Sequence, residues 1–102
     1  MSLLNSIKTA LRISIANTAF DDEISDLIAA AQNDLRLSGV ADEKAQDEED
    51  ALIRRAVSVY VKANFGWDNP DAERLQLSYD KLKAHLTLSG EYAAAREEDP
   101  VL

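Results

Sequence analysis

The sequence predicts an all-α protein, a small bundle of four helices with a short first helix and an extended C-terminal tail. Apolar residues recur at helical spacing in four segments, and no stretch alternates for long enough to form a strand. Gly39, Gly66 and Gly90 each follow one of these segments, where helices often end. The chain has 102 residues, enough for one domain only. We expect a helical domain over residues 1–90 and a flexible acidic tail over residues 91–102.

The first two predicted helices span residues 2–11 and 19–37. The first is too short to be stable alone, so its apolar stripe must dock on the rest of the chain. Thr18 is the expected N-cap of the second helix, and the acidic residues 21–23 suit the positive end of the helix dipole. The stripe predicted to be buried in this helix consists of Phe20, Ile24, Leu27, Ile28, Ala31 and Leu35.

The third predicted helix spans residues 49–65 and follows a loop at residues 38–48. We expect the acidic residues at the end of this loop to form the first turn of the helix. One apolar face consists of Ile53, Ala56, Val57, Tyr60, Val61 and Asn64, and a second consists of Leu52, Val59 and Ala63. A surface this wide predicts either the central helix of the bundle or a helix that also meets a partner subunit.

The fourth predicted helix spans residues 70–88, with Asn69 as N-cap and Pro70 as first helical residue. Its predicted buried stripe consists of Leu75, Tyr79, Leu82 and Leu86. Leu77, Ala84 and Leu88 lie to one side of this stripe.

The charge and the lack of cysteine exclude several classes of function. The chain has 11 basic and 19 acidic residues and a net charge of −8, which argues against binding to duplex DNA or to an anionic membrane. Without cysteine it has no disulfides, thiolate nucleophiles or zinc ribbons. No apolar run has the length of a membrane span, and we expect no signal peptide.

Few residues are candidates for chemistry. His85 is the single histidine, and no catalytic or nucleotide-binding motif accompanies it. It could be a general base or a pH sensor at a subunit interface, but a partly exposed helical residue is the simpler interpretation. The acidic residues 42–50 lack the spacing of a calcium loop. We therefore predict no enzymatic activity, no metal and no cofactor.

Two further features suggest a binding surface. Trp67 lies in a connection, where it either anchors an interface or caps the end of the bundle. Arg54, Arg55 and Lys62 give the third helix a basic strip. This strip pairs either with the acidic turn of a neighbouring subunit or with carboxylates such as Asp50 of the same chain.

Several segments form a pattern through their order and spacing. They are residues 8–13 (KTALRI), 21–24 (DDEI), 27–31 (LIAAA), 53–62 (IRRAVSVYVK) and 78–92 (SYDKLKAHLTLSGEY). The first fits K-x-x-L-R-I at the end of a first helix, and together the segments resemble the head–tail connector (adaptor) proteins of tailed phages and prophages. Two features depart from that family. Residues 35–39 stand where many relatives have a second aromatic cluster, and the loop before the third helix is unusually acidic.

The resemblance implies a structural virion protein without catalysis or cofactor. Such proteins form a ring below the portal vertex after DNA packaging, extend the DNA channel and support the next neck or tail-completion protein. The chain would then be a homo-oligomer with about twelve copies on the portal. DNA would pass through without sequence-specific binding, and no membrane would be involved. The protein would be made in the bacterial host cytoplasm and reside in the virion neck.

A ring joins one face of each subunit to a different face of the next, which suggests which residues form the contacts. The apolar interface candidates are Leu52, Val59, Ala63, Leu77 and Leu88, with Trp67 as a further candidate. The charged candidates are Asp21, Asp22, Glu23 and Asp26, expected to meet Arg54, Arg55 and Lys62 of a neighbour. Glu91, Tyr92 and Arg96 are the portal-contact candidates.

Two further expectations concern the assembled state. A net negative ring would repel DNA phosphates, so that the duplex slides through without sticking. The alternative to a ring is a small helical protein-binding or regulatory module that uses the acidic loop and the third helix as its partner surface.

Overall fold

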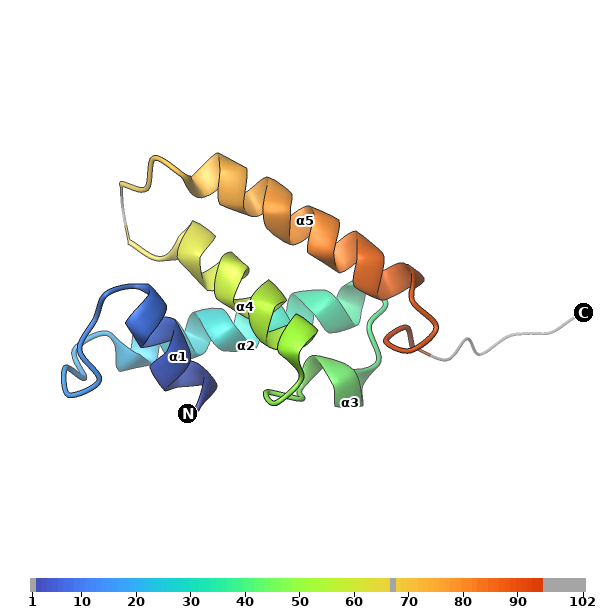
Figure 1. The fold of residues 1–102 in the computed structure, drawn as a ribbon, viewed down its shortest axis with the longest axis horizontal. Helices are drawn as coiled ribbons and strands as arrows, with labels where there is room; N and C mark the ends of the chain where they lie inside the picture. Colours follow the sequence, from blue (N-terminus) through green and yellow to red (C-terminus); the bar gives the residue numbers. More distant parts are fainter. Residues whose placement is uncertain (1, 67, 95–102) are drawn as a thin grey trace, which may run out of the picture.

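The computed structural model describes residues 2–66 and 68–94 and confirms the all-α fold. Its helices are α1 (Leu3–Ala10), α2 (Asp21–Ser38), α3 (Asp42–Ala45), α4 (Ala51–Asn64) and α5 (Ala72–Leu88) (Figure 1). Four of these are the predicted helices. The fifth, α3, is a four-residue helix inside the segment that was predicted to be a loop.

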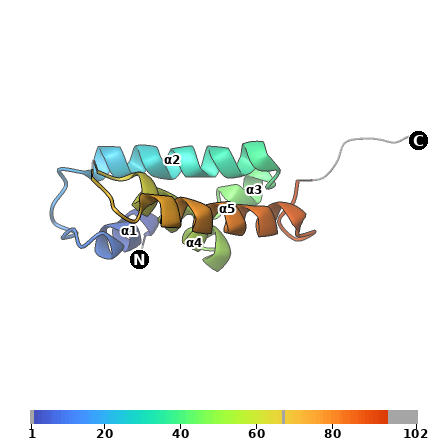
Figure 2. The same cartoon turned by 90° about the horizontal axis from the view of Figure 1, so that it is seen from above.

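Helix α4 lies at the centre of the bundle and packs against α1, α2 and α5. Figure 2 shows α2 along one side of the molecule, with α1, α4 and α5 toward the other side. The buried residues of the four long helices are Leu3 and Ile7 of α1, Ile24, Ile28, Ala31 and Leu35 of α2, Ile53, Ala56, Val57, Val61 and Ala63 of α4, and Tyr79 and Leu86 of α5. The wide apolar surface of α4 is therefore explained mainly by its central position.

The helix starts differ from those predicted. Helix α2 begins at Asp21 after Phe20, whose side chain makes no capping hydrogen bond, so Thr18 is not its N-cap. Helix α5 begins at Ala72, and Asn69 forms a turn before it by accepting a hydrogen bond from the backbone N–H of Asp71 (3.0 Å). Such turns compete with helix starts because short polar side chains bond equally well to nearby loop backbone.

The start of α4 is also later than predicted. Asp50 is its N-cap, and its carboxylate accepts hydrogen bonds from the backbone N–H groups of Leu52 (2.9 Å) and Ile53 (3.1 Å). The first turn of α4 contains no acidic residue, because the acidic cluster lies before the helix. Among the acidic residues of this segment, Asp50 is therefore the one that caps α4.

The end of α1 turns sharply through Arg12, which has a left-handed backbone (φ 65°). The N–H of Ile13 donates to the carbonyl of Lys8 (2.8 Å), and the N–H of Arg12 donates to the carbonyl of Thr9 (3.0 Å). These two bonds define a Schellman motif, whose left-handed position is usually a glycine. Arg12 therefore occupies a conformation that is costly for an L-residue.

Residues 89–94 fold back against the domain after α5. The N–H of Ala41 donates to the carbonyl of Tyr92 (2.9 Å), and the N–H of Ala94 donates to the carbonyl of Gly39 (2.8 Å). The Tyr92 side chain is 8% exposed and belongs to the hydrophobic core. The structure thus places the first four residues of the segment expected to be a tail, residues 91–94, against α2, α3 and α4. Residues 95–102 lie outside the described residues.

Candidate assembly surfaces

A groove of about 460 Å³ runs along the outer face of α4, between the end of α1 and the start of α5. We call it the basic groove. It is lined by Ala10, Arg54, Arg55, Ser58, Val59, Lys62, Arg74, Leu75 and Ser78. Four of these residues are basic and none is acidic, although the chain has 19 acidic residues against 11 basic ones. The groove therefore concentrates positive charge on one side of an acidic protein.

The helical period explains why α4 supplies most of the groove. Residues three, four and seven apart share one face of a helix, so Arg55, Ser58, Val59 and Lys62 project together. Ile53 and Val57 project from the opposite face into the core, and no residue of α2 lines the groove. The basic groove consequently opens away from α2.

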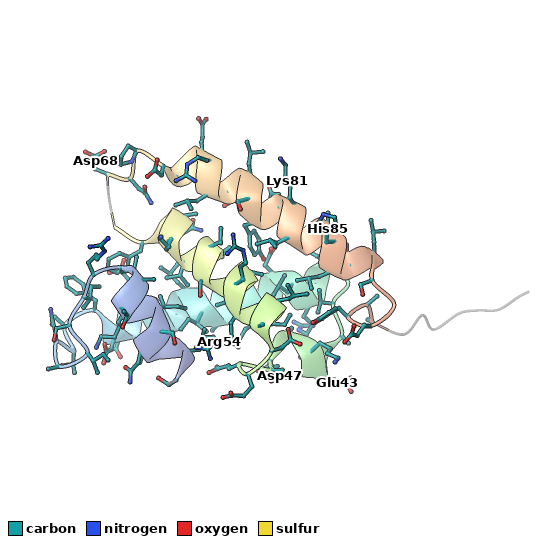
Figure 3. All side chains as sticks on the ribbon, viewed as in Figure 1. Glu43, Asp47, Arg54, Asp68, Lys81 and His85 are labelled. Carbon is teal, nitrogen blue, oxygen red and sulfur yellow. The ribbon has the colours of Figure 1, made fainter. Side chains whose placement is uncertain are left out.

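Arg54 of α4, labelled in Figure 3, is hydrogen-bonded to other residues of its own chain. Its guanidinium donates to the carbonyl of Glu48 (2.7 Å) and to the hydroxyl of Ser6 (2.5 Å). These bonds connect α4 to α1 and to the segment before α4. Arg54 therefore has an internal role beside its place in the groove, but its partners are a carbonyl and a hydroxyl rather than a carboxylate such as Asp50, which the sequence offered as the alternative.

The other basic residues of the groove have fewer internal partners. Arg74 forms an ion pair with Asp71 (3.6 Å) in which both side chains are well exposed, and such pairs contribute little. Arg55 and Lys62 take part in no ion pair within residues 2–66 and 68–94. Their charges remain available to a ligand or partner at this face.

An acidic surface lies at the start of α2. Asp22, Glu23 and Asp26, which we call the acidic turn, are exposed, and none forms an ion pair in the described part of the chain. Asp22 and Asp26 are four residues apart and lie opposite Ile24 and Ile28, which face the core. The acidic turn therefore faces away from α4.

Asp21 differs from its acidic neighbours because it binds Lys8 of α1. The Lys8 ammonium lies 2.7 Å from an Asp21 carboxylate oxygen and donates to the carbonyl of Ile15 (3.0 Å). Lys8 is only 1% exposed. This pair fixes the connection between α1 and α2, so Asp21 serves an internal contact rather than an open surface.

The apolar interface candidates divide into exposed and packed residues. Leu52, Leu77 and Leu88 are exposed, Leu88 by 85%. Val59 is half-buried at the groove, and Ala63 is buried in the chain itself. Leu37 is also 75% exposed, which the sequence reasoning missed. Leu37 lies beside the polar face of the second helix, and this position could have indicated its exposure from the sequence.

The portal-contact candidates have different environments. Glu91 is exposed, whereas the Tyr92 hydroxyl lies between the two carboxylate oxygens of Asp50 (2.9 and 3.0 Å). The hydrogen bond to Asp50, followed by burial, raises the pKa of Tyr92 above its ordinary value. Trp67 and Arg96 lie outside the described residues.

A second polar network connects α2 to α5. One carboxylate oxygen of Asp34 accepts hydrogen bonds from the Tyr79 hydroxyl (2.6 Å) and from the Lys83 ammonium (3.0 Å). Burial and the nearby carboxylate raise the pKa of Tyr79 well above its ordinary value. The Tyr79 ring also packs edge-on against Tyr60 of α4 (5.1 Å). We interpret the network as structural, because each group in it is bonded to another.

The positions considered for chemistry are dispersed. His85 is exposed on α5 (Figure 3). Among residues 2–66 and 68–94, no three His, Cys, Asp or Glu side chains gather as metal ligands would. Glu43 and Asp47 lie near α3 and away from α5 (Figure 3). None of the helices in these residues is both long and apolar enough to cross a membrane.

Comparison with known proteins places this fold in a family. A search of curated proteins and a search of solved structures each gave no match. The family model described as phage connector protein matches residues 3–93, which include all five helices and the segment that carries Tyr92. This match, over most of an all-helical chain, shows that the protein belongs to the phage connector protein family and has the structural role of a head–tail connector.

Proposed function

We propose that the protein forms a homo-oligomeric ring between the portal and the tail, in the neck of the virion. The observation that carries this proposal is the family match over residues 3–93. The ring would extend the DNA channel and complete the head after packaging, with about twelve copies on the portal. Its partners would be the portal protein and the next neck or tail-completion protein. The chain would be made in the cytoplasm of the bacterial host.

The arrangement of charge supports a ring. The basic groove opens away from α2, and the acidic turn projects away from α4. A subunit with complementary surfaces on opposite sides can add copies head to tail, which is the contact that generates rings. A two-fold dimer would require one surface to match itself.

Apolar residues would add buried area to this ring. We propose Val59, which lines the groove, and the exposed residues Leu52, Leu77 and Leu88 as parts of subunit contacts. Trp67 remains a proposed anchor. Burial of apolar surface is the main favourable term in such contacts, while exposed ion pairs contribute roughly 0.2–1 kcal/mol each.

The surplus negative charge would serve the channel. With a net charge of −8 per copy, a ring whose bore is lined by acidic residues would repel DNA phosphates. The basic groove must then lie between subunits or on the outside of the ring, away from the DNA. The exposed Glu91 would be available to the portal, whereas the Tyr92 hydroxyl is bonded to Asp50; Arg96 remains a proposed portal contact.

The decisive experiment combines the chain with the purified portal protein of the same phage. Negative-stain images should show a ring with a central hole on the portal. The control is the portal protein alone, imaged under the same conditions. Failure to form such a ring with folded, monodisperse portal protein would contradict the proposed function.

A further inference from the structure

We propose that the basic groove of one copy receives the acidic turn of α2 of the next copy, so that these two surfaces set the register of the ring. The inference deepens the proposed function and rests on it, because it assigns the contact that joins the subunits. It begins from the concentration of four basic residues, and no acidic ones, around one groove of an acidic chain.

The groove has charge to offer a partner. Arg54 is bonded to Glu48 and Ser6, and Arg74 has a loose pair with Asp71. Arg55 and Lys62 have no ionic partner in the described ranges. Seven residues separate them, which places them about two helical turns, or roughly 10 Å, apart on one face of α4. The site thus presents two positive charges on one face of α4, and the apolar residues Val59 and Leu75 also line the groove.

The acidic turn matches this site in charge and shape. Asp22 and Asp26 are one helical turn, or about 6 Å, apart on the outer face of α2, and Glu23 lies beside them. Ser25 and Ala29, which are small and exposed, lie next to these acids. A helix with short side chains on its outer face can enter a groove more deeply than a helix with long ones.

The positions of the two surfaces favour a second copy as the occupant. In Figure 2, α2 lies along one side of the molecule, with α1, α4 and α5 toward the other side. The groove is lined by α1, α4 and α5, and the acidic turn faces away from α4, so neither surface can satisfy the other within one chain. Each copy therefore carries one complete donor surface and one complete acceptor surface. A nucleic acid fits less well, since the net charge of −8 repels phosphates and two free basic residues make too few phosphate contacts.

Two double charge reversals test the contact. Asp22→Lys/Asp26→Lys reverses the acidic turn, and Arg55→Glu/Lys62→Glu reverses the groove. Amide spectra of ¹⁵N-labelled protein are recorded from about 20 µM to about 1 mM, a range that detects dissociation constants near the millimolar level. In the wild type, signals from both surfaces should shift together as concentration rises. Each double variant should weaken self-association at least tenfold.

Mixing the two double variants gives the sharpest result. The lysines of one variant then face the glutamates of the other, and the unchanged surfaces face each other, so association should return to within about threefold of the wild type. The matched controls are Glu43→Lys/Glu48→Lys and Arg36→Glu/Lys81→Glu, which change the net charge equally at exposed positions outside both surfaces. These controls should associate like the wild type.

Separate control experiments test whether the variants fold and whether they form rings. Circular dichroism verifies that each variant remains helical, and Asp26→Lys alone replaces the acidic double variant if Asp22→Lys weakens the start of α2. The inference is overturned if wild-type signals do not shift up to about 1 mM, if the mixture does not recover, or if the controls weaken association equally. If the groove-reversed variant forms rings on the portal as well as the wild type, the inference fails while the proposed ring stands.

Discussion

Arg12 shows how a single residue can oppose the local preference of its backbone. It takes the left-handed position at the end of α1 (φ 65°), where a glycine avoids the clash between Cβ and the carbonyl oxygen. Its side chain is exposed, and two backbone hydrogen bonds hold the turn. The arginine lies within the K-T-A-L-R-I segment that resembles the family, whereas composition and periodicity did not indicate a turn there.

Replacing Arg12 by glycine should stabilise the protein. Relief of the backbone strain exceeds the extra chain entropy of glycine, so we expect a gain of about 0.5–1 kcal/mol in the free energy of unfolding. Urea unfolding followed by circular dichroism measures it. Arg12→Lys keeps the strained backbone and should match the wild type. A glycine variant less stable than the wild type would show that the arginine side chain stabilises the turn.

Asp34 should make stability depend on acid pH. Burial raises its pKa, but the hydrogen bonds from Tyr79 and Lys83 outweigh burial and hold the pKa of Asp34 below its ordinary value. A depressed folded pKa contributes stability that is present above the unfolded pKa, near pH 4, and is lost as pH falls through the folded pKa. Acid should therefore weaken the connection between α2 and α5.

The variant Asp34→Asn tests this dependence. At pH 7 it should lower the free energy of unfolding by about 1–2 kcal/mol, because the charged acceptor of two hydrogen bonds is replaced by a neutral amide oxygen, which accepts more weakly. Between about pH 5 and pH 2.5, its stability should fall less steeply than that of the wild type. Urea unfolding midpoints measured across this pH range compare the slopes of the variant and the wild type. Asp26→Asn, at an exposed position, should retain the wild-type slope.

Residue pairings were the part of the fold least accessible from the sequence. Lys8 is charged, yet it is buried because the chain brings Asp21 and the carbonyl of Ile15 to it. Tyr79 was predicted to be buried, but its partner Asp34 lies 45 residues away. Periodicity identifies which face of a helix is covered, whereas the identity of a bonded partner depends on how the helices cross.

At the scale of elements, periodicity predicted the four long helices and most of their buried faces. Their ends were less predictable, because Asn69 and Thr18 resemble N-caps in sequence but do not cap α5 and α2. Helix α3 was missed because four residues are too few to show a period. The two capping errors concern short polar side chains, whose hydrogen bonds fit several local conformations.

Two truncations should locate the end of the folded domain. A chain without residues 91–102 should be less stable than a chain without residues 95–102, by about 2–4 kcal/mol in the free energy of unfolding. The longer truncation deletes buried Tyr92, its hydrogen bonds to Asp50 and the backbone bonds to Gly39 and Ala41. Thermal unfolding of both variants measures the difference. Equal stability of the two would show that residues 91–94 contribute nothing to the domain.

At the scale of the whole molecule, Val59 tests whether the outer face of α4 joins subunits. Val59→Glu places a carboxylate beside Arg55 and Lys62 in the groove, where it should compete with the acidic turn of a neighbour and prevent ring formation. Because Val59 is half-buried, we expect a cost of about 1–2 kcal/mol and a folded monomer. Image analysis with the portal protein and circular dichroism measure the two effects.

A conservative variant separates packing from assembly. Val59→Thr retains the shape of the side chain and adds no charge, so it should still form rings. If Val59→Glu instead loses its cooperative unfolding transition, the face is part of the core and its assignment as an interface is wrong.

The sequence indicated the charged surfaces better than their internal connections. It placed the basic strip on the third helix and the acidic cluster at the start of the second, and both surfaces are present. It also grouped Asp21 and Arg54 with these surfaces, whereas each has a partner inside the chain. The contribution of α5 to the groove, through Arg74, was not found, because it depends on how α5 returns alongside α4.

The opposite placement of the two charged surfaces has a consequence for the control of assembly. After any number of additions, a growing chain of subunits still has one unfilled groove and one unfilled acidic turn. If this contact joins the subunits as proposed, growth would end only where the rotation between neighbours closes the set, at about 30° for twelve copies. A rotation that does not close would give a helical filament. In the proposed ring, the portal would act as a template that selects one of these geometries.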